Sequence, residues 1–183
     1  MKNKKQKKTI LSALVLALVL SAVLFTVGCS HTSPSFLPYQ SQSFFAKATL
    51  DINHEKYSVD ITKDSGNVYK IVFTSPETLN GVCVEKNGKD ISYKFGNVSI
   101  PLFADSTLCS YITECFELKK SDMASIKSEL YNGTKVNIST FSCSFGELTL
   151  ILSAETNLPL RIETTVNDIP VILNFSDFTI TEE

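Results

Sequence analysis

Residues 46–63 read "AKATLDINHEKYSVDITK", and this stretch decides the fold class. Apolar side chains stand at positions 46, 48, 50 and 52, with polar ones between them, and after a polar turn apolar side chains return at 57, 59 and 61. A period of two is typical of β-strands that have one buried face and one wet face. The stretch therefore predicts two neighbouring strands of an antiparallel sheet.

The same alternation continues on both sides of one interruption. It recurs in "VYKIVFTS" (68–75), in "VCVEKNGKDISYKFG" (82–96) and in "VSIPL" (98–102). Within the second of these, Asn87-Gly88 is a hairpin turn signal. Four further alternating segments follow, at 134–141, 147–153, 158–166 and 170–180. We predict about ten strands in a single sheet.

The interruption predicts two helices. Residues 105–120, "DSTLCSYITECFELKK", carry apolar side chains at helical spacing. Residues 121–133, "SDMASIKSELYNG", are interpreted as a second short helix that Asn132-Gly133 ends. The predicted fold is mainly β (α+β), a curved antiparallel sheet with a two-helix cover inserted near the middle. Because these helices bring only about seven apolar side chains, we expect part of the concave face to stay open to a ligand.

The N-terminus has the layout of an export signal. Five lysines fall within residues 1–8, and residues 9–28 are uncharged and mostly apolar. "TVGC" (26–29) resembles the bacterial lipobox, in which Gly28 fits the small position before the cysteine and Cys29 the cysteine that receives diacylglycerol. A retained membrane helix is the alternative, since a run of twenty uncharged, mostly apolar residues is also long enough to span a bilayer. Both interpretations place the rest of the chain outside the cytoplasm.

We therefore predict three parts: a lipoprotein signal peptide (1–28), a lipidated cysteine with a flexible tether (29–44), and a folded domain (45–183). Without the five lysines of the signal, the chain has twelve basic and 19 acidic residues, and therefore a net charge of −7. An acidic domain with a single arginine is a poor partner for nucleic acid. The composition, rich in Lys and Asn, suggests a Gram-positive source, and the predicted location is the outer face of the cell membrane.

Four cysteines lie beyond the anchor: Cys83, Cys109, Cys115 and Cys143. An even number in an exported chain permits two disulfides, and buried free thiols are the alternative. In the predicted helix, Cys109 and Cys115 would lie about 9 Å apart along the axis, too far to pair with each other. No metal-binding or catalytic motif is present, so we predict neither cofactor nor enzymatic activity.

Two turn segments carry a family resemblance. "FTSPETLNG" (73–81) has a proline that ends a strand, and "TNLPLRI" (156–162) has Pro159 at the start of a strand whose Leu160 and Ile162 would face inward. With the strand order, the helical insertion and the anchor, they make the chain resemble the LolA/LolB-type lipoprotein-carrier superfamily. That resemblance implies a half-barrel with a helical lid over residues 45–180. It also implies a non-enzymatic role in which acyl chains or other hydrophobic ligands bind the concave face.

The predicted function is thus a membrane-anchored lipoprotein that binds a lipid, acyl chain or lipopeptide in its half-barrel. The alternative is an envelope protein–protein interaction or regulatory module with a fully packed core, and the feature that separates them is the state of the interior. For each lining residue, a place in an ordinary core is the competing interpretation. The candidate lining residues are Val59, Ile61, Ile71, Phe73, Val84, Ile91, Tyr93, Ile100, Leu148 and Leu150.

Overall fold

The alternating stretch at 46–63 forms a β-hairpin in the computed structural model, which describes residues 37–102 and 108–181. Strand β1 (Ser43–Ile52) pairs with β2 (Glu55–Lys63) across a two-residue turn. Both turn residues, Asn53 and His54, have positive φ (51° and 72°), as a type I′ turn requires. The predicted two-strand unit is confirmed.

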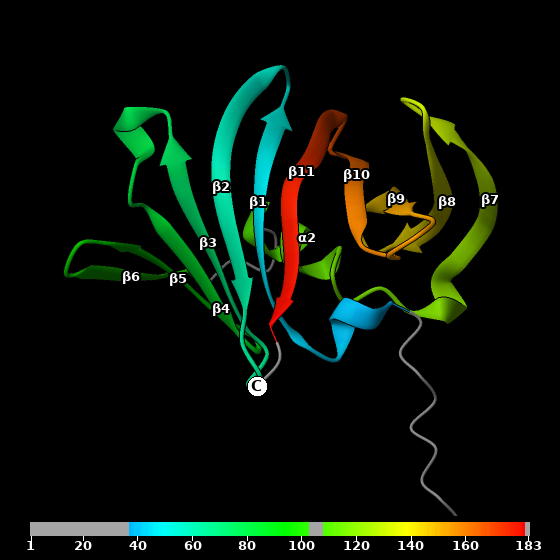
Figure 1. Cartoon of the computed structure of the whole chain (residues 1–183). Coiled ribbons are helices and arrows are strands. Elements are labelled where there is room, and N and C mark those ends of the chain that lie inside the picture. The colour runs from blue at the N-terminus through cyan, green and yellow to red at the C-terminus, as the bar shows by residue number, and fades with distance from the viewer. Residues whose placement is uncertain (1–36, 103–107, 182–183) are drawn as a thin grey trace, which may run out of the picture. The chain divides into compact units, whose positions relative to one another are not determined.

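Eleven strands within the described residues form one open antiparallel sheet (Figure 1). The predicted mainly β architecture is therefore confirmed, with one strand more than expected. Besides β1 and β2, the strands are β3 (Val68–Ser75), β4 (Cys83–Asn87), β5 (Asp90–Phe95), β6 (Val98–Leu102), β7 (Met123–Tyr131), β8 (Thr134–Cys143), β9 (Gly146–Ser153), β10 (Pro159–Val166) and β11 (Ile169–Thr181).

The spatial order of the strands is β6-β5-β4-β3-β2-β1-β11-β10-β9-β8-β7. The sheet thus consists of a first arm, β1 to β6, and a second arm, β7 to β11, which meet where β1 pairs with β11. That seam runs from Ser43↔Thr181 to Ile52↔Val171. Strands β6 and β7 are consecutive strands in the chain, but they lie at opposite edges of the sheet. The segment between them must therefore pass from one arm to the other.

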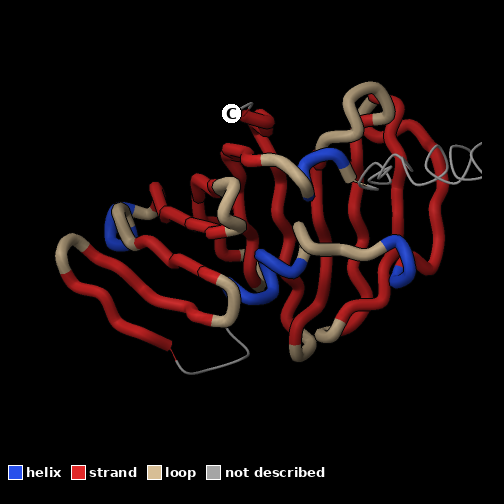
Figure 2. The backbone as a smooth tube through the Cα atoms, turned by 90° about the horizontal axis from the view of Figure 1, so that it is seen from below, coloured by secondary structure: helices blue, strands red, loops and turns tan. Residues whose placement is uncertain are grey.

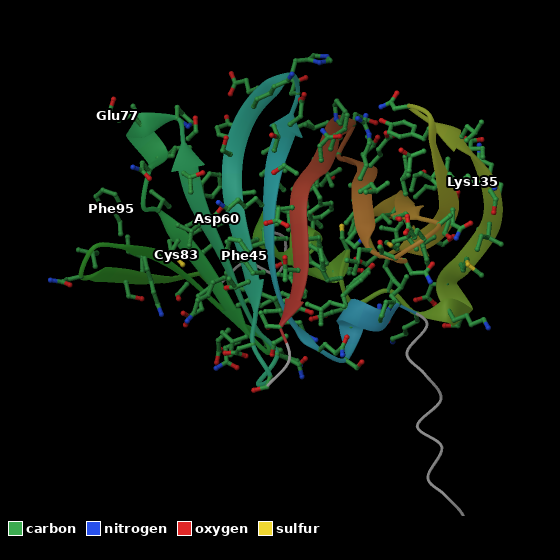
Figure 3. The ribbon with its side chains drawn as sticks, in the orientation of Figure 1. Phe45, Asp60, Glu77, Cys83, Phe95 and Lys135 are labelled. Carbon is green, nitrogen blue, oxygen red and sulfur yellow. The ribbon has the colours of Figure 1, made fainter. Side chains whose placement is uncertain are left out.

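The two faces of the sheet differ as the alternation predicts. On β1, Ala46 and Leu50 are fully buried, whereas Lys47 between them is exposed. Figure 3 shows Phe45 of β1 and Asp60 of β2 on the outer face of the sheet. There the Lys47 ammonium lies 5.9 Å from the centre of the Phe45 ring. The main hydrophobic core therefore lies on the inner, concave face.

The predicted two-helix cover is wrong. The first helix exists only as α2 (Leu108–Glu114), and the second segment is the edge strand β7. Asn132 and Gly133 have φ values of 50° and 81°, so they form a hairpin turn into β8 and do not end a helix. Three short 3-10 turns complete the helical content of the described chain: η1 (Pro38–Gln40), η2 (Glu77–Leu79) and η3 (Lys120–Asp122).

Two further expectations differ from the structure in detail. The register of β10 shifts between Pro159 and Arg161, so Leu160 packs in a second cluster with Val136, Ile138 and Ile151, whereas Ile162 packs in the main core. An irregularity of this kind breaks the alternation of faces. The packed chain also begins before residue 45, because Leu37 is buried in the main core.

Within the described residues, no helix has both the length and the apolar character needed to cross a membrane. The predicted signal peptide and the candidate anchor Cys29 lie outside the described residues, and both stay predictions.

Candidate functional site: the strap and its groove

The concave face is covered by residues 108–122, which we call the strap. The strap comprises α2, a short irregular stretch and η3, and it leads into β7. Figure 2 shows the strands as an arc, with α2 and the following segment inside it. Ile112, Cys115, Phe116 and Leu118 of the strap are buried in the main core. Their spacing along the turn of α2 and just beyond it places all four on the side that meets the sheet.

Phe116 is the centre of an aromatic cluster. Its ring centroid lies 5.0–6.5 Å from the centroids of five other rings, mostly at tilted or edge-on angles. Such arrangements suit the ring quadrupoles and add to the energy of burial. The five partners come from η1 and from three strands of the two arms, β1, β3 and β11, so Phe116 joins the arms and the N-terminal turn. They are Tyr39, Phe44, Tyr69, Phe175 and Phe178.

Polar contacts fasten the strap to both arms. The Ser144 hydroxyl and its backbone N–H, in the β8–β9 turn, donate to the Glu114 carboxylate at 3.0 and 3.3 Å. The Lys86 ammonium on β4 lies 3.4 Å from the Glu117 carboxylate. Glu114 therefore faces the second arm and Glu117 the first. These contacts are solvent-exposed, so each contributes little to stability but fixes the position of the strap.

The N-terminal turn η1 is also hydrogen-bonded to the strap. The side-chain amide of Gln40 donates to the Leu118 carbonyl at 2.6 Å. The Lys63 ammonium, in a side chain that is 4% exposed, donates to the Gln40 carbonyl. Burial lowers the pKa of Lys63, while the nearby Glu117 and Asp64 carboxylates oppose that shift. A buried lysine bonded to backbone carbonyls thus holds η1 in place.

Little space remains between α2 and the sheet. The apolar cavity under α2 has a volume of about 10 Å³ and is lined by residues such as Leu50, Ile112, Ile162 and Leu173. That is about the space that one water molecule needs. The Tyr39 hydroxyl is fully buried and has no hydrogen-bond partner in the described part of the chain, and burial raises the pKa of Tyr39. Under α2 the predicted concavity is therefore filled by the protein's own side chains.

The structure brings nine of the ten candidate lining residues to this core. Seven are buried in it, namely Val59, Ile61, Ile71, Val84, Ile91, Leu148 and Leu150, and Phe73 and Tyr93 are half-buried against it. Ile100 differs: it lies on the edge strand β6 with 57% of its surface exposed. The buried residues belong to one core cluster that also contains buried residues of the strap, as ordinary core residues do. A ligand role for them stays a prediction.

A groove of about 710 Å³ lies on the concave side beside the strap. Its walls come from the β4–β5 turn, the strap and the β8–β9 turn, so both arms contribute. Lysines and carboxylates share the lining with three serines and the Cys143 thiol. The charged lining residues are Lys86, Lys89, Asp90, Glu114, Glu117, Lys119 and Asp122. A volume of this size is usual for a binding site, but its lining is more polar than that of most small-molecule pockets.

The described cysteines have the properties of unreactive thiols. Cys83, Cys115 and Cys143 are free, and the side chain of Cys109 lies outside the described residues. Burial, reinforced by the Glu114 and Asp122 carboxylates, raises the pKa of Cys143 to about 11. Burial also raises the pKa of Cys115. Both thiols are protonated at neutral pH, which is unfavourable for a nucleophile. Within the described chain, no three or more His, Cys, Asp or Glu residues converge as a metal site.

The groove and the aromatic cluster were not predicted from the sequence. Groove residues come from three segments that are far apart in the chain and share no motif, so no local pattern indicates them. For the cluster a partial signal exists, because Ile112 and Phe116 lie at helical spacing. What the spacing cannot show is which rings of the sheet Phe116 meets.

Comparison with protein-family profiles finds no match, and comparison with curated protein sequences finds none either. Among solved structures, an uncharacterized conserved protein from Thermus thermophilus is similar at a TM-score of 0.53 and 12% identity, over 78% of this chain and 81% of that one. A LolA superfamily protein from Nitrosomonas europaea is similar at 0.43 and 11% identity, over 78% and 88%. Lipoprotein LppX from Mycobacterium tuberculosis is similar at 0.45 and 14%, over 79% and 93%. The first likeness shows a shared fold, and no functional conclusion rests on the two lower scores.

Proposed function

We propose that this chain is a non-catalytic, lipid-anchored domain of the bacterial cell envelope that binds a protein partner in the groove beside the strap. In this proposal Cys29 carries the diacylglyceryl anchor, and the domain works on the outer face of the membrane of a Gram-positive cell. Membership of the LolA/LolB-type superfamily belongs to the same proposal.

The packed interior is the observation that carries the choice of partner. The strap leaves an apolar cavity of about 10 Å³, whereas the polar groove beside it measures about 710 Å³. Binding sites for small molecules usually enclose about 300–1,000 Å³, so the groove has the capacity of a site and the apolar cavity does not. A fully packed interior is the feature that favours an interaction module over a carrier.

The chemistry of the groove suits a polar polypeptide segment. Its lining combines lysines of the β4–β5 region and of the strap with carboxylates such as Glu114 and Asp122. An acyl chain placed here would remove water from these charges without replacing their hydrogen bonds, which is unfavourable. A peptide can pair its own amides and charges with them. The arrangement therefore favours a partner whose bound segment carries both signs of charge.

Photo-crosslinking in native membranes tests this proposal. A photoreactive residue replaces Lys89 or Lys119 in the groove, and a control replaces Glu77, which lies on η2 well away from it. We expect the same protein to crosslink from both groove positions and not from position 77. The Lys86→Glu substitution should weaken that crosslink because it reverses a charge in the lining. Crosslinks to lipid alone, or to no protein, would count against the proposal.

A hydrophobic ligand is the second candidate, and the way in which the strap is attached favours it. The strap is held by side-chain contacts and apolar packing and forms no strand ladder with the sheet. A ligand that displaced Ile112 and Phe116 would meet the predicted lining residues. Native mass spectrometry of detergent-free residues 30–183 checks this: a lipid retained at constant stoichiometry would support it, and protein that neither carries nor acquires lipid would oppose it.

A further inference from the structure

Strand β7 forms an open edge of the sheet. Among the described residues it pairs with β8 only, and seven consecutive residues, 124–130, are exposed. Ile126 and Leu130 are 57% and 70% exposed. Unpaired edge strands carry free backbone donors and acceptors, which makes them templates for another strand. A nine-residue edge strand with two exposed aliphatic side chains is therefore a candidate surface for pairing with another strand.

The hairpin register determines which backbone groups are free. Tyr131 pairs with Thr134 across the two-residue turn Asn132-Gly133, so these two residues exchange hydrogen bonds. Along an antiparallel pair, bonded and non-bonded positions alternate. Residues 127, 129 and 131 thus bond to β8, and the N–H and C=O groups of Ile126, Ser128 and Leu130 point away from the sheet.

We propose that β7 pairs antiparallel with β7 of a second copy of this chain, about a two-fold axis at Ser128. In that register Ile126 of each copy lies opposite Leu130 of the other, and Lys127 lies opposite Glu129 of the other. Both contacts therefore occur twice. The positions that would be bonded, 126, 128 and 130, are those whose backbone groups point away from β8. Apolar pairs and opposite-charge pairs across strands each add to the stability of a sheet.

Charge pairing selects this register among the alternatives. A shift of the axis to Ile126 places Lys127 opposite Ser125, and a shift to Leu130 places Glu129 opposite Tyr131. An axis at 127 would place Lys127 opposite Lys127 of the other copy, and an axis at 129 would place Glu129 opposite Glu129. Both registers would also need backbone groups that are already bonded to β8. In the single chain, the Lys127 ammonium lies 3.2 Å from the Glu129 carboxylate on the same face of β7, and 63% and 43% of the two side chains are exposed. Because both side chains are exposed, they can exchange this pairing for one with a second strand.

The opposite edge of the sheet explains why pairing would stop at two copies. Strand β6 has five residues, against nine in β7, and includes Pro101. Proline has no N–H and is typical of protected edges. In the two-fold dimer the β7 edges of the two copies pair with each other, so neither edge is left to bind a third copy. The contact therefore gives a discrete dimer and not a fibre.

Charge reversal tests the register through sedimentation of the full-length protein in detergent micelles. We expect Lys127→Glu alone, and Glu129→Lys alone, to weaken the wild-type dimer roughly tenfold or more, because each places like charges opposite each other twice. An equimolar mixture of the two variants should form a heterodimer, because every facing pair is then of opposite sign. No effect within one chain can produce that rescue. Lys56→Glu, a matched charge reversal at an exposed site on β2, should leave the dimer unchanged.

Cysteine crosslinking in native membranes gives a second measurement. Facing Cα atoms at a bonded antiparallel pair lie about 5.5 Å apart, which is within disulfide reach. We expect Ser128→Cys to form a disulfide dimer on mild oxidation, above the level of the wild type. Leu130→Cys should not crosslink to itself, but should crosslink to Ile126→Cys when the two are expressed together.

The two experiments have outcomes that overturn the proposal. A wild-type protein that sediments as a monomer at every concentration would do so, as would failure of the charge-reversed mixture to associate. Equal crosslinking from positions 128 and 130 would show random collision. None of these outcomes depends on the groove, so the proposed function and the β7 contact are tested separately.

Discussion

Phe116 is the residue on which the covered concave face most depends. Five rings surround it and it is 1% exposed. We expect Phe116→Ala to lower the free energy of unfolding by about 3–5 kcal/mol, because it removes a buried ring and leaves a cavity. Phe95→Ala is the control, since Phe95 is 61% exposed on the β5–β6 hairpin (Figure 3) and its loss should change stability by less than about 0.5 kcal/mol. Urea unfolding measures both, and equal effects would contradict the central place of Phe116.

Tyr39 gives a prediction of the opposite sign. Its hydroxyl is buried without a hydrogen-bond partner in the described chain. An unpaired buried hydroxyl is unfavourable by about 1–3 kcal/mol, so Tyr39→Phe should keep or raise the free energy of unfolding. Thermal and urea unfolding of the variant measure this. A clear loss of stability would show that the hydroxyl has a partner.

At this scale the sequence predicts which residues are apolar and inward-facing, but not which contacts they make. The alternation places Ile61, Ile71 and Leu150 on the inner face, and all three are buried there. Tyr39 lies in a segment that reads as a polar tether, rich in Ser, Gln and Pro, yet it is fully buried. Its burial depends on Phe44, Phe116 and Phe178, which approach it only in the folded chain.

The strap is the element whose anchoring can be tested directly. Glu114→Ala removes two hydrogen bonds to Ser144 that hold α2 to the second arm. Because these bonds are exposed, we expect the free energy of unfolding to change by less than about 1 kcal/mol. Amide hydrogen exchange in residues 110–118 should nevertheless accelerate, since local opening becomes easier.

Glu77→Ala, on the exposed η2 turn, is the matched control and should leave strap exchange unchanged. If strap exchange in the Glu114→Ala variant equals that of the wild type, the apolar contacts of Ile112 and Phe116 alone hold the strap.

The second predicted helix shows where sequence patterns are ambiguous. Met123, Ile126 and Leu130 have helical spacing, but the segment between them is also long enough for a strand. Asn-Gly serves as a hairpin turn between two strands, and the φ values of Asn132 and Gly133 identify that role. The pattern after residue 134 is strongly alternating, and a partner strand in front of it satisfies the edge of β8. Pairing along the sheet therefore decides the structure of β7.

For the whole molecule, the seam and the two edges differ in stability. Strands β1 and β11 lie at the centre of the sheet and pair along ten positions. We expect their amides to exchange slowest, and those of β6 and β7 to exchange fastest in dilute protein, because edge amides have fewer partners. Hydrogen exchange resolved by segment measures this gradient. Uniform protection across all strands would contradict it.

The overall architecture is the part that the sequence predicts best. Alternation of apolar and polar residues specifies a one-sided antiparallel sheet, and the described residues form one. The state of the interior could not be predicted, because it depends on whether a fifteen-residue strap between two edge strands, 108–122, fits the curvature of the sheet. Counting apolar residues in the strap underestimates its cover, since Phe116 alone contacts rings from both arms.

The buried Lys63 has a mechanical consequence. Its ammonium fixes the Gln40 carbonyl, and the Gln40 side chain in turn bonds to the Leu118 carbonyl of the strap. Tension applied to the chain ahead of residue 37 would therefore load these two bonds before it loads any rung of the β1–β11 seam. A force applied at the N-terminal end would thus act on the strap, which covers the concave face, before it acts on the central strands.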